Sequence, residues 1–334
     1  MNAPLKFSLI VPVFNRPEEV RELLQSLTAQ TYTEFEVIIA EDGSQQTCEN
    51  EVALFRDKLD IKYFYKPNEG PGLTRNFGAN KASGNYFIFF DSDCLIPDAY
   101  MQTVKNALET ELLDVFGGPD AAHPSFSPIQ KAISYSMTSF FTTGGIRGGD
   151  KKVDVFHPRS FNMGLSKEVF EKTGGFAKMR FGEDLDMSMR IIEAGYKAGL
   201  IREAFVYHKR RTDFRKFFRQ IHNSGIARIN LYKRHPQTLK IVHFVPAVFV
   251  VFLAFSLLLL LFGYLTGIFI ILAYFTVILI DSWQLNNDLE IGLLSVQSSF
   301  VQHLAYGTGF IKAFWQRIIL GKPEFHAYEK NFYK

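Results

Sequence analysis

The chain has 334 residues, a formal net charge of +3 and two cysteines. This length is sufficient for one sizeable α/β domain and a further region. The nearly balanced charge gives no electrostatic reason to expect a nucleic-acid partner, and the two cysteines are too few for a disulfide framework, which fits a reducing compartment.

The N-terminal part alternates between predicted strands and helices. Residues 1–6 lack an apolar run followed by a small-residue cleavage site, so we expect no signal peptide and a cytoplasmic location for the N-terminal domain. Pro17 is typical of the first turn of a helix. The strands are predicted at 7–14, 35–40, 61–65 and 86–90. Such alternation predicts a mostly parallel sheet with right-handed crossovers.

The strand at 86–90 is followed at once by two carboxylates, Asp91 and Asp93. Its aromatic and β-branched residues predict a strand that is buried on both faces. The two acids lie at its carboxyl end, where open α/β sheets bind ligands, and their spacing directs both side chains to one side. Although Asp-x-Asp is also common in ordinary loops, such paired oxygen ligands suit Mg²⁺ or Mn²⁺.

Other polar residues follow the neighbouring predicted strands. Asp42 follows the strand at 35–40, and Arg75 lies near the start of a helix that follows a glycine-rich turn at 70–72. A helix N-terminus of this kind can approach a phosphate, and arginine adds positive charge. The turn alone is a weak indication, because most such turns bind nothing.

The middle and later parts of the domain are harder to interpret. Residues 117–154 include a glycine-rich segment at 144–149, which is either a mobile loop that closes over a ligand or a disordered connector. The acids at 183–186 begin a predicted helix, and helix capping is their ordinary explanation. His208 precedes a basic run at 209–219, which is either a solvated face or a surface that attracts anionic headgroups.

The C-terminal third is apolar. Between residues 241 and 280, His243 is the one ionisable side chain other than tyrosine. This run is about twice the length needed to cross a bilayer, and residues 263–267 divide it, so we predict a transmembrane hairpin at about 241–281. The segment at about 291–320 is apolar but interrupted by polar residues, which predicts an interfacial or re-entrant helix.

Several blocks, in this order and spacing, resemble the family 2 glycosyltransferases of the GT-A fold, in the membrane-anchored form that many bacterial members have. They lie at 11–15, 41–44, 72–76, 91–93, 161–164, 173–176 and 182–184. The resemblance covers residues 5–235. It implies an α/β fold, a Rossmann-like mixed sheet with helices on both faces, over residues 1–235, followed by a membrane region over 236–334.

The resemblance also implies roles for residues on the donor side of a site. Asp42 would bind the nucleotide base, with uracil preferred, and Arg75 would face the nucleotide or its diphosphate. Pro12 and Asn15 would line the base pocket, while Asp91 and Asp93 would hold the metal, with Asp91 also close to the donor. His208 would be a third ligand, although it is equally explained as a surface histidine.

On the acceptor side, the resemblance implies that Asp184 is the general base, with Asp186 as the alternative. Asn162 and Glu183 would help to hold the sugar or the acceptor. The chemistry requires such groups, because a departing diphosphate needs a cation and an attacking hydroxyl needs a base.

These expectations describe an inverting hexosyltransferase that depends on Mn²⁺ or Mg²⁺. A nucleotide sugar, preferably a UDP-sugar, would donate to a hydroxyl of a lipid-linked or cell-surface glycan, in polysaccharide biosynthesis. The enzyme would contact membrane lipids at the cytoplasmic face of the inner membrane. One alternative is a polyprenyl-phosphate sugar synthase, whose acceptor needs little base catalysis. A second is a non-catalytic membrane scaffold with a degenerate GT-A fold.

Overall fold

The computed structural model describes residues 4–111, 113–144 and 156–324, which form two compact units. The α/β unit contains residues 4–123 and 156–209, and the helical unit contains residues 124–144 and 210–324. The helical unit therefore begins before the predicted division at residue 235. Except for Gly144, the predicted loop at 144–149 lies outside the described residues.

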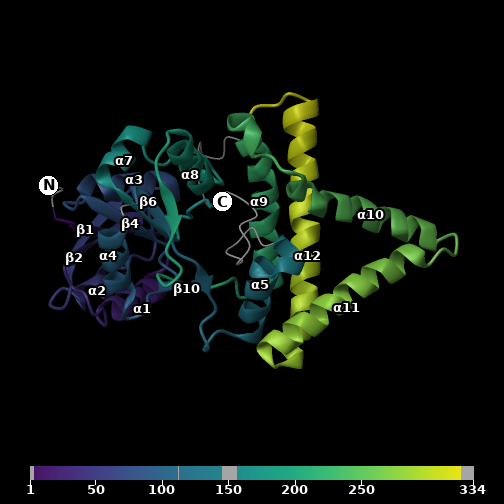
Figure 1. Cartoon of the computed structure of the whole chain (residues 1–334), viewed down its shortest axis with the longest axis horizontal. Helices are drawn as coiled ribbons and strands as arrows, with labels where there is room; N and C mark the ends of the chain where they lie inside the picture. The colour runs from purple at the N-terminus through teal and green to yellow at the C-terminus, as the bar shows by residue number, and fades with distance from the viewer. Residues whose placement is uncertain (1–3, 112, 145–155, 325–334) are drawn as a thin grey trace. The chain divides into compact units, whose positions relative to one another are not determined.

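The α/β unit is built on a seven-stranded mixed sheet (Figure 1). In spatial order its strands are β3 (Asp60–Lys66), β2 (Phe35–Asp42), β1 (Phe7–Val13), β4 (Tyr86–Phe90), β8 (Asn162–Ser166), β6 (Val115–Gly117) and β9 (Ala198–Leu200). The first four strands run parallel, whereas β8 is antiparallel to both of its neighbours. The predicted α/β fold with a mixed sheet is confirmed.

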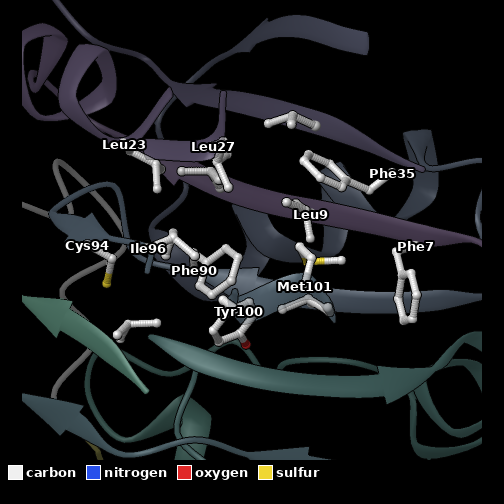
Figure 2. Packing of buried hydrophobic residues seen from close by; sticks show 14 of the residues in the cluster. Phe7, Leu9, Leu23, Leu27, Phe35, Phe90, Cys94, Ile96, Tyr100 and Met101 are labelled. Atoms are coloured by element: carbon white, nitrogen blue, oxygen red, sulfur yellow. The ribbon is translucent and has the colours of Figure 1, made fainter. Parts of the chain in front are cut away.

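Helices cover both faces of this sheet, as predicted. One layer contains α1 (Pro17–Leu27), α2 (Glu49–Ala53) and α4 (Tyr100–Thr110), and the other contains α3 (Pro71–Lys81), α7 (Lys167–Thr173) and α8 (Glu183–Glu193). On β4, Ile88 and Phe90 face the first layer, while Phe87 and Phe89 face the second. Figure 2 shows Phe90 packed near Tyr100 in the first core.

A small second sheet contains β5 (Cys94–Leu95), β10 (Val206–His208) and β7 (Asp120–Ala121). Its central strand β10 is antiparallel to β5 and parallel to β7. Because β5 follows Asp93 directly, this sheet brings the end of β10 to the acids that follow β4. The sheet thus joins two parts of the chain that are more than a hundred residues apart.

The helical unit is arranged around α12 (Leu289–Phe314), which continues into the π-helix η3 (Trp315–Ile319). Against α12 pack α5 (Pro128–Thr138), α9 (Phe214–Arg234), α10 (Val245–Leu260) and α11 (Thr266–Asn286), and α6 (Phe140–Thr143) follows α5. Short 3₁₀ helices at Pro236–Thr238 and Ile241–Phe244 connect α9 to α10.

Two segments of this unit are long and apolar enough to cross a membrane. They are Ile241–Leu260 and Thr266–Asn286, which coincide with the predicted hairpin, and they are largely exposed. Figure 1 shows α10 and α11 meeting at a tip remote from α12. The interfacial position of residues 291–320 stays a prediction, although the structure shows a continuous helix there and no re-entrant break.

Candidate active site

The carboxyl ends of β1 and β2 are joined through Asn15. This exposed residue has a positive φ of 52°, and its Oδ1 accepts hydrogen bonds from the backbone N–H groups of Gln45 (2.7 Å) and Gln46 (3.1 Å). Pro12 is half-buried in β1, beyond the last residue that pairs with β4, so its missing N–H breaks no bond to that strand. Both residues lie at the sheet edge where the sequence predicted a nucleotide pocket.

Asp42 is the most fully bonded carboxylate of this edge. Its side chain is 1% exposed. Oδ1 accepts from Lys66 Nζ (3.0 Å) and the Glu69 N–H (2.9 Å), and Oδ2 accepts from the Gly70 N–H (2.8 Å) and Asn68 Nδ2 (3.2 Å). A carboxylate has about four acceptor directions. Asp42 therefore holds the loop that leads into α3, and its contact with a base stays a prediction.

Arg75 connects three of the sequence blocks. It lies in the second turn of α3, is 3% exposed, and donates to Asp91 Oδ1 (2.6 Å) and to Glu183 Oε1 (3.2 Å). Its guanidinium also lies over the ring of Phe176 at 5.4 Å. The buried Nε has no hydrogen-bond partner among the described residues. The structure thus places Arg75, which the resemblance predicts to face the nucleotide or its diphosphate, between the block at 91–93 and the block at 182–184.

His208 lies against the two acids that follow β4. In the small sheet it pairs with Cys94, and its Nε2 is 3.1 Å from Asp93 Oδ1 and 3.9 Å from Asp91 Oδ2. Its ring is stacked on Phe161. The ligand atoms of Asp93, Cys94 and His208 all lie within 4.8 Å of one another. Carboxylate and imidazole ligands at this spacing fit a divalent cation such as Mn²⁺.

Arg16 is a residue of this cluster that the sequence analysis missed. Its guanidinium contacts Asp93 Oδ2, on the other side of the carboxylate from His208, and also reaches Glu19 at 3.9 Å. Arg16 follows Asn15 at the end of β1, and β1 is the neighbour of β4 in the sheet. The position of β1 beside β4 is the feature from which the contact of Arg16 with Asp93 could have been expected.

The acids at the start of α8 differ in their surroundings. Burial and the charge of Asp184 raise the pKa of Glu183 to about 7, although Arg75 opposes this shift. Burial alone would also raise the pKa of Asp184, but Arg159, which donates from Nε at 2.7 Å, and the Leu185 N–H lower it instead. Neighbouring carboxylates with pKa values shifted in opposite directions are typical of acid–base sites.

Two predicted residues lie inside the fold. Asn162 is 0% exposed, and its amide is hydrogen-bonded to the Tyr100 hydroxyl (2.5 Å) and the Ala204 carbonyl (2.8 Å). Asp186, the alternative base, is also buried and accepts from Arg190 Nε at 2.9 Å. Both side chains are buried within the fold, and their roles at the candidate site stay predictions.

Sequence comparisons link the chain to known proteins. The models for "Glycosyl transferase family 2" and "Glycosyl transferase family group 2" match residues 8–174 and 153–284. An uncharacterized glycosyltransferase of Rickettsia conorii is 42% identical over 90 residues, which are 27% of this chain and 15% of that protein. Glycosyltransferase AglE of Haloferax volcanii is 25% identical over 218 residues, which are 63% of this chain and 69% of AglE.

Among solved structures, the mannosyltransferase PcManGT of Pyrobaculum calidifontis, in complex with GDP-Man and Mn²⁺, is similar with a TM-score of 0.64. The match covers 94% of this chain and 88% of that chain at 14% identity, so it supports the fold alone. Since the family 2 model matches half of the chain and the mixed sheet agrees with it, the protein belongs to the family 2 glycosyltransferases and has the GT-A fold.

Proposed function

We propose that the protein is an inverting glycosyltransferase that moves a sugar from a nucleotide sugar, preferably a UDP-sugar, to a hydroxyl of a lipid-linked or cell-surface glycan. The observation that carries this proposal is the double ion pair of Arg75 with Asp91 and Glu183. It joins the end of β4 to the start of α8, so a donor beside Asp91 and an acceptor beside Asp184 would share one cluster.

Asp91, Asp93 and His208 would hold Mn²⁺ or Mg²⁺. Such a cation, when bound, stabilises the negative charge that develops on a departing diphosphate. The buried Arg75 Nε is a donor with no partner among the described residues, and a phosphate oxygen is the kind of acceptor that would satisfy it. Pro12 and Asn15 would line the pocket of the nucleotide base, and Asp42 would bind the base.

Asp184 would act as the general base for the acceptor hydroxyl. Because Arg159 lowers its pKa, Asp184 is ionised at neutral pH and can accept a proton. Glu183, on the same turn, would bind the sugar or the acceptor. Among the described residues of the cluster, Asp184 is the candidate base, while Asp91 and Glu183 are both paired with Arg75, which supports direct displacement with inversion.

The two apolar helices support attachment to a membrane, with the α/β unit in the cytoplasm. Only 11% and 22% of their most apolar 18-residue windows are buried within the structure, so most of their side chains are left for lipid. An enzyme attached in this way would meet a lipid-linked or membrane-associated acceptor at the cytoplasmic face of the inner membrane.

One observation favours the second candidate, a polyprenyl-phosphate sugar synthase. The Arg159 contact that keeps Asp184 ionised also makes it a weaker base. A phosphate acceptor is already ionised and would tolerate a weak base. Competing transfer assays with polyprenyl phosphate and with a hydroxyl glycan acceptor distinguish the two candidates, because Asp184→Asn would reduce only the hydroxyl reaction strongly.

The first experiment is calorimetric binding of UDP, GDP and dTDP to the full chain in detergent, with and without Mn²⁺. We expect metal-dependent binding of one nucleotide, which Asp93→Ala abolishes and which the control Asp98→Ala, at an exposed position outside the cluster, leaves unchanged. If no nucleotide binds under any metal condition, the donor site is rejected and the scaffold alternative gains support.

A further inference from the structure

The C-terminal end of α12 differs from the rest of that helix. Up to Phe310 one side of α12 is buried against the neighbouring helices. Between residues 311 and 322 the chain exposes large apolar side chains together with basic ones, although Ala313 stays buried. We name this segment, residues 311–322, the terminal patch. Its exposed apolar and basic members are Ile311, Lys312, Phe314, Trp315, Ile319, Leu320 and Lys322.

Specific contacts hold the terminal patch in place. Arg317 donates from Nε to Asn230 Oδ1 at 3.0 Å, on α9, and from Nη1 to the carbonyl of Lys322 at 2.7 Å. Ile318, which is only partly exposed, packs against the buried cluster that contains Ile229. The exposed aromatic and aliphatic side chains therefore belong to an ordered surface with one face in the core.

The terminal patch lies beside the point where the first candidate membrane span begins. Phe244, just before α10, packs against Phe310 with ring centroids 5.1 Å apart, and Ala247 shares a core cluster with Ala313. A helix that crosses a bilayer enters it at the headgroup region. If α10 begins to cross near Ile241, the terminal patch lies at the depth of the headgroups.

The chemistry of the terminal patch suits that depth. Trp315 is 59% exposed, and tryptophan is enriched where an apolar ring meets a wet, polar layer. Lys312 and Lys322 can extend apolar stems along lipid and place their charges among headgroups. The combination of exposed apolar rings with lysines is complementary to a negatively charged lipid surface.

We propose that the terminal patch is an interfacial lipid-binding site that selects anionic headgroups. This proposal rests on the proposed membrane attachment through α10 and α11. The hairpin alone fixes how deep the helical unit lies, whereas a second attachment at residues 311–322 also fixes its rotation about the hairpin axis. The proposed partner of the terminal patch is the membrane surface. The experiment below would reject this proposal if the patch responded to another protein instead.

The two tryptophans of the chain provide the experiment. Trp283→Phe leaves Trp315 as the single reporter of the terminal patch, and Trp315→Phe leaves Trp283, which lies in α11. Each variant of the full chain is placed in nanodiscs of phosphatidylcholine, with or without phosphatidylglycerol. Quenching of tryptophan fluorescence is then measured with lipids brominated close to the headgroup or near the end of the acyl chain.

We expect Trp315 to be quenched most strongly by bromine close to the headgroup, and more strongly in the anionic nanodiscs. If Trp283 is quenched and Trp315 is not, the hairpin is in the membrane and the terminal patch is not, so this inference is rejected and the proposed attachment stands. If neither tryptophan is quenched, both are rejected. Trp315 fluorescence that changes only on addition of another protein would also reject it.

Charge selectivity is tested separately. Lys312→Gln with Lys322→Gln should remove the difference in Trp315 quenching between anionic and neutral nanodiscs, since each basic residue near such a surface contributes roughly a fivefold preference. A matched pair, Arg56→Gln with Lys58→Gln, removes two exposed charges from the α/β unit and should retain the difference. Equal quenching of Trp315 in both nanodiscs, measured in the Trp283→Phe chain that keeps both lysines, would reject anionic selectivity.

Discussion

The two units bury polar groups of different kinds. In the α/β unit the buried polar groups include charged pairs, such as Asp42 with Lys66 and Arg75 with Asp91. In the helical unit the buried pairs are mostly neutral, such as the hydroxyls of Ser136 and Ser298, 2.7 Å apart. Removing a charge from water costs free energy unless the charge is paired. The α/β unit therefore has a desolvation cost that the helical unit largely lacks.

This difference in buried polar groups reflects different requirements of the two units. Charged pairs gather at the ends of the parallel strands, where they create the strong local fields that catalysis requires. The helical unit needs close contact between helices instead. A Cβ at Gly307 would lie 2.2 Å from the Pro246 carbonyl oxygen, and one at Gly309 would lie 2.1 Å from that of His222. Small residues and short hydroxyls permit this approach, as in membrane helix bundles.

Breaking the central charged pair should have the largest effect. Arg75→Gln leaves Asp91 and Glu183 without their shared cation, so we expect a loss of about 3–5 kcal/mol in unfolding free energy together with the loss of nucleotide binding. Denaturant unfolding and calorimetry measure the two effects. Arg21→Gln, an exposed arginine on α1, is the matched control and should change neither quantity appreciably.

Arg75→Lys refines this test. Lysine keeps the charge but cannot donate to two carboxylates with the same planar geometry, so stability should recover more than binding does. If Arg75→Gln were as stable as the wild type, the pair would not hold the two blocks together as proposed.

Replacing the candidate base should reduce turnover and leave nucleotide affinity unchanged. Asp184→Asn keeps the shape of the side chain but cannot accept the acceptor proton, so we expect turnover to fall about 10²–10⁴-fold while nucleotide affinity is retained. Steady-state kinetics and calorimetry separate the two quantities. Asp186→Asn removes the bond to Arg190 and should mainly reduce stability. If turnover fell in Asp186→Asn and was retained in Asp184→Asn, Asp186 would be identified as the base.

Glu183 should make stability depend on pH. Its pKa is about 7 in the folded protein and 4.5 ordinarily, so the folded state binds this proton more tightly and its stability falls as pH rises between these values. Glu183→Gln should remove that slope and raise the unfolding free energy above pH 7 by at most about 3 kcal/mol. Unfolding midpoints from about pH 5 to about pH 8 measure it.

The control for this experiment is Glu203→Gln, at an exposed position in the α/β unit. It should keep the wild-type slope. A Glu183→Gln variant with the same slope as the wild type would show that another group titrates in this range.

Much of the fold could be predicted because its signals are local. Alternating strands and helices predict the sheet, and the apolar run from residue 241 predicts two long helices. Asp91 and Asp93 were predicted as metal ligands because the pair comes directly after the strand at 86–90. The resemblance also suggested His208, and the structure shows that the small sheet brings it to Asp93.

The partners of these residues could not be predicted from spacing. Arg16 reaches Asp93 because β1 lies beside β4, and Arg159 reaches Asp184 across 25 residues. Such contacts depend on the register of elements that are distant in sequence. The same reason explains why α5 was not recognised as part of the helical unit, since its bond from Tyr135 to Asp281 spans 146 residues.

The smallest expected effect is in the neutral pairs. Removing either hydroxyl with Ser136→Ala or Ser298→Ala should reduce stability slightly, and the double variant should show a coupling of about 0.6 kcal/mol, typical of hydrogen bonds between membrane helices. Unfolding of the full chain in detergent measures this double-mutant cycle. Thr110→Ala is the control, because its hydroxyl bonds only within its own helix. A coupling as large as the loss expected for Arg75→Gln would contradict the contrast between the two units, because α5 and α12 would then depend on this bond as strongly as the candidate site depends on Arg75.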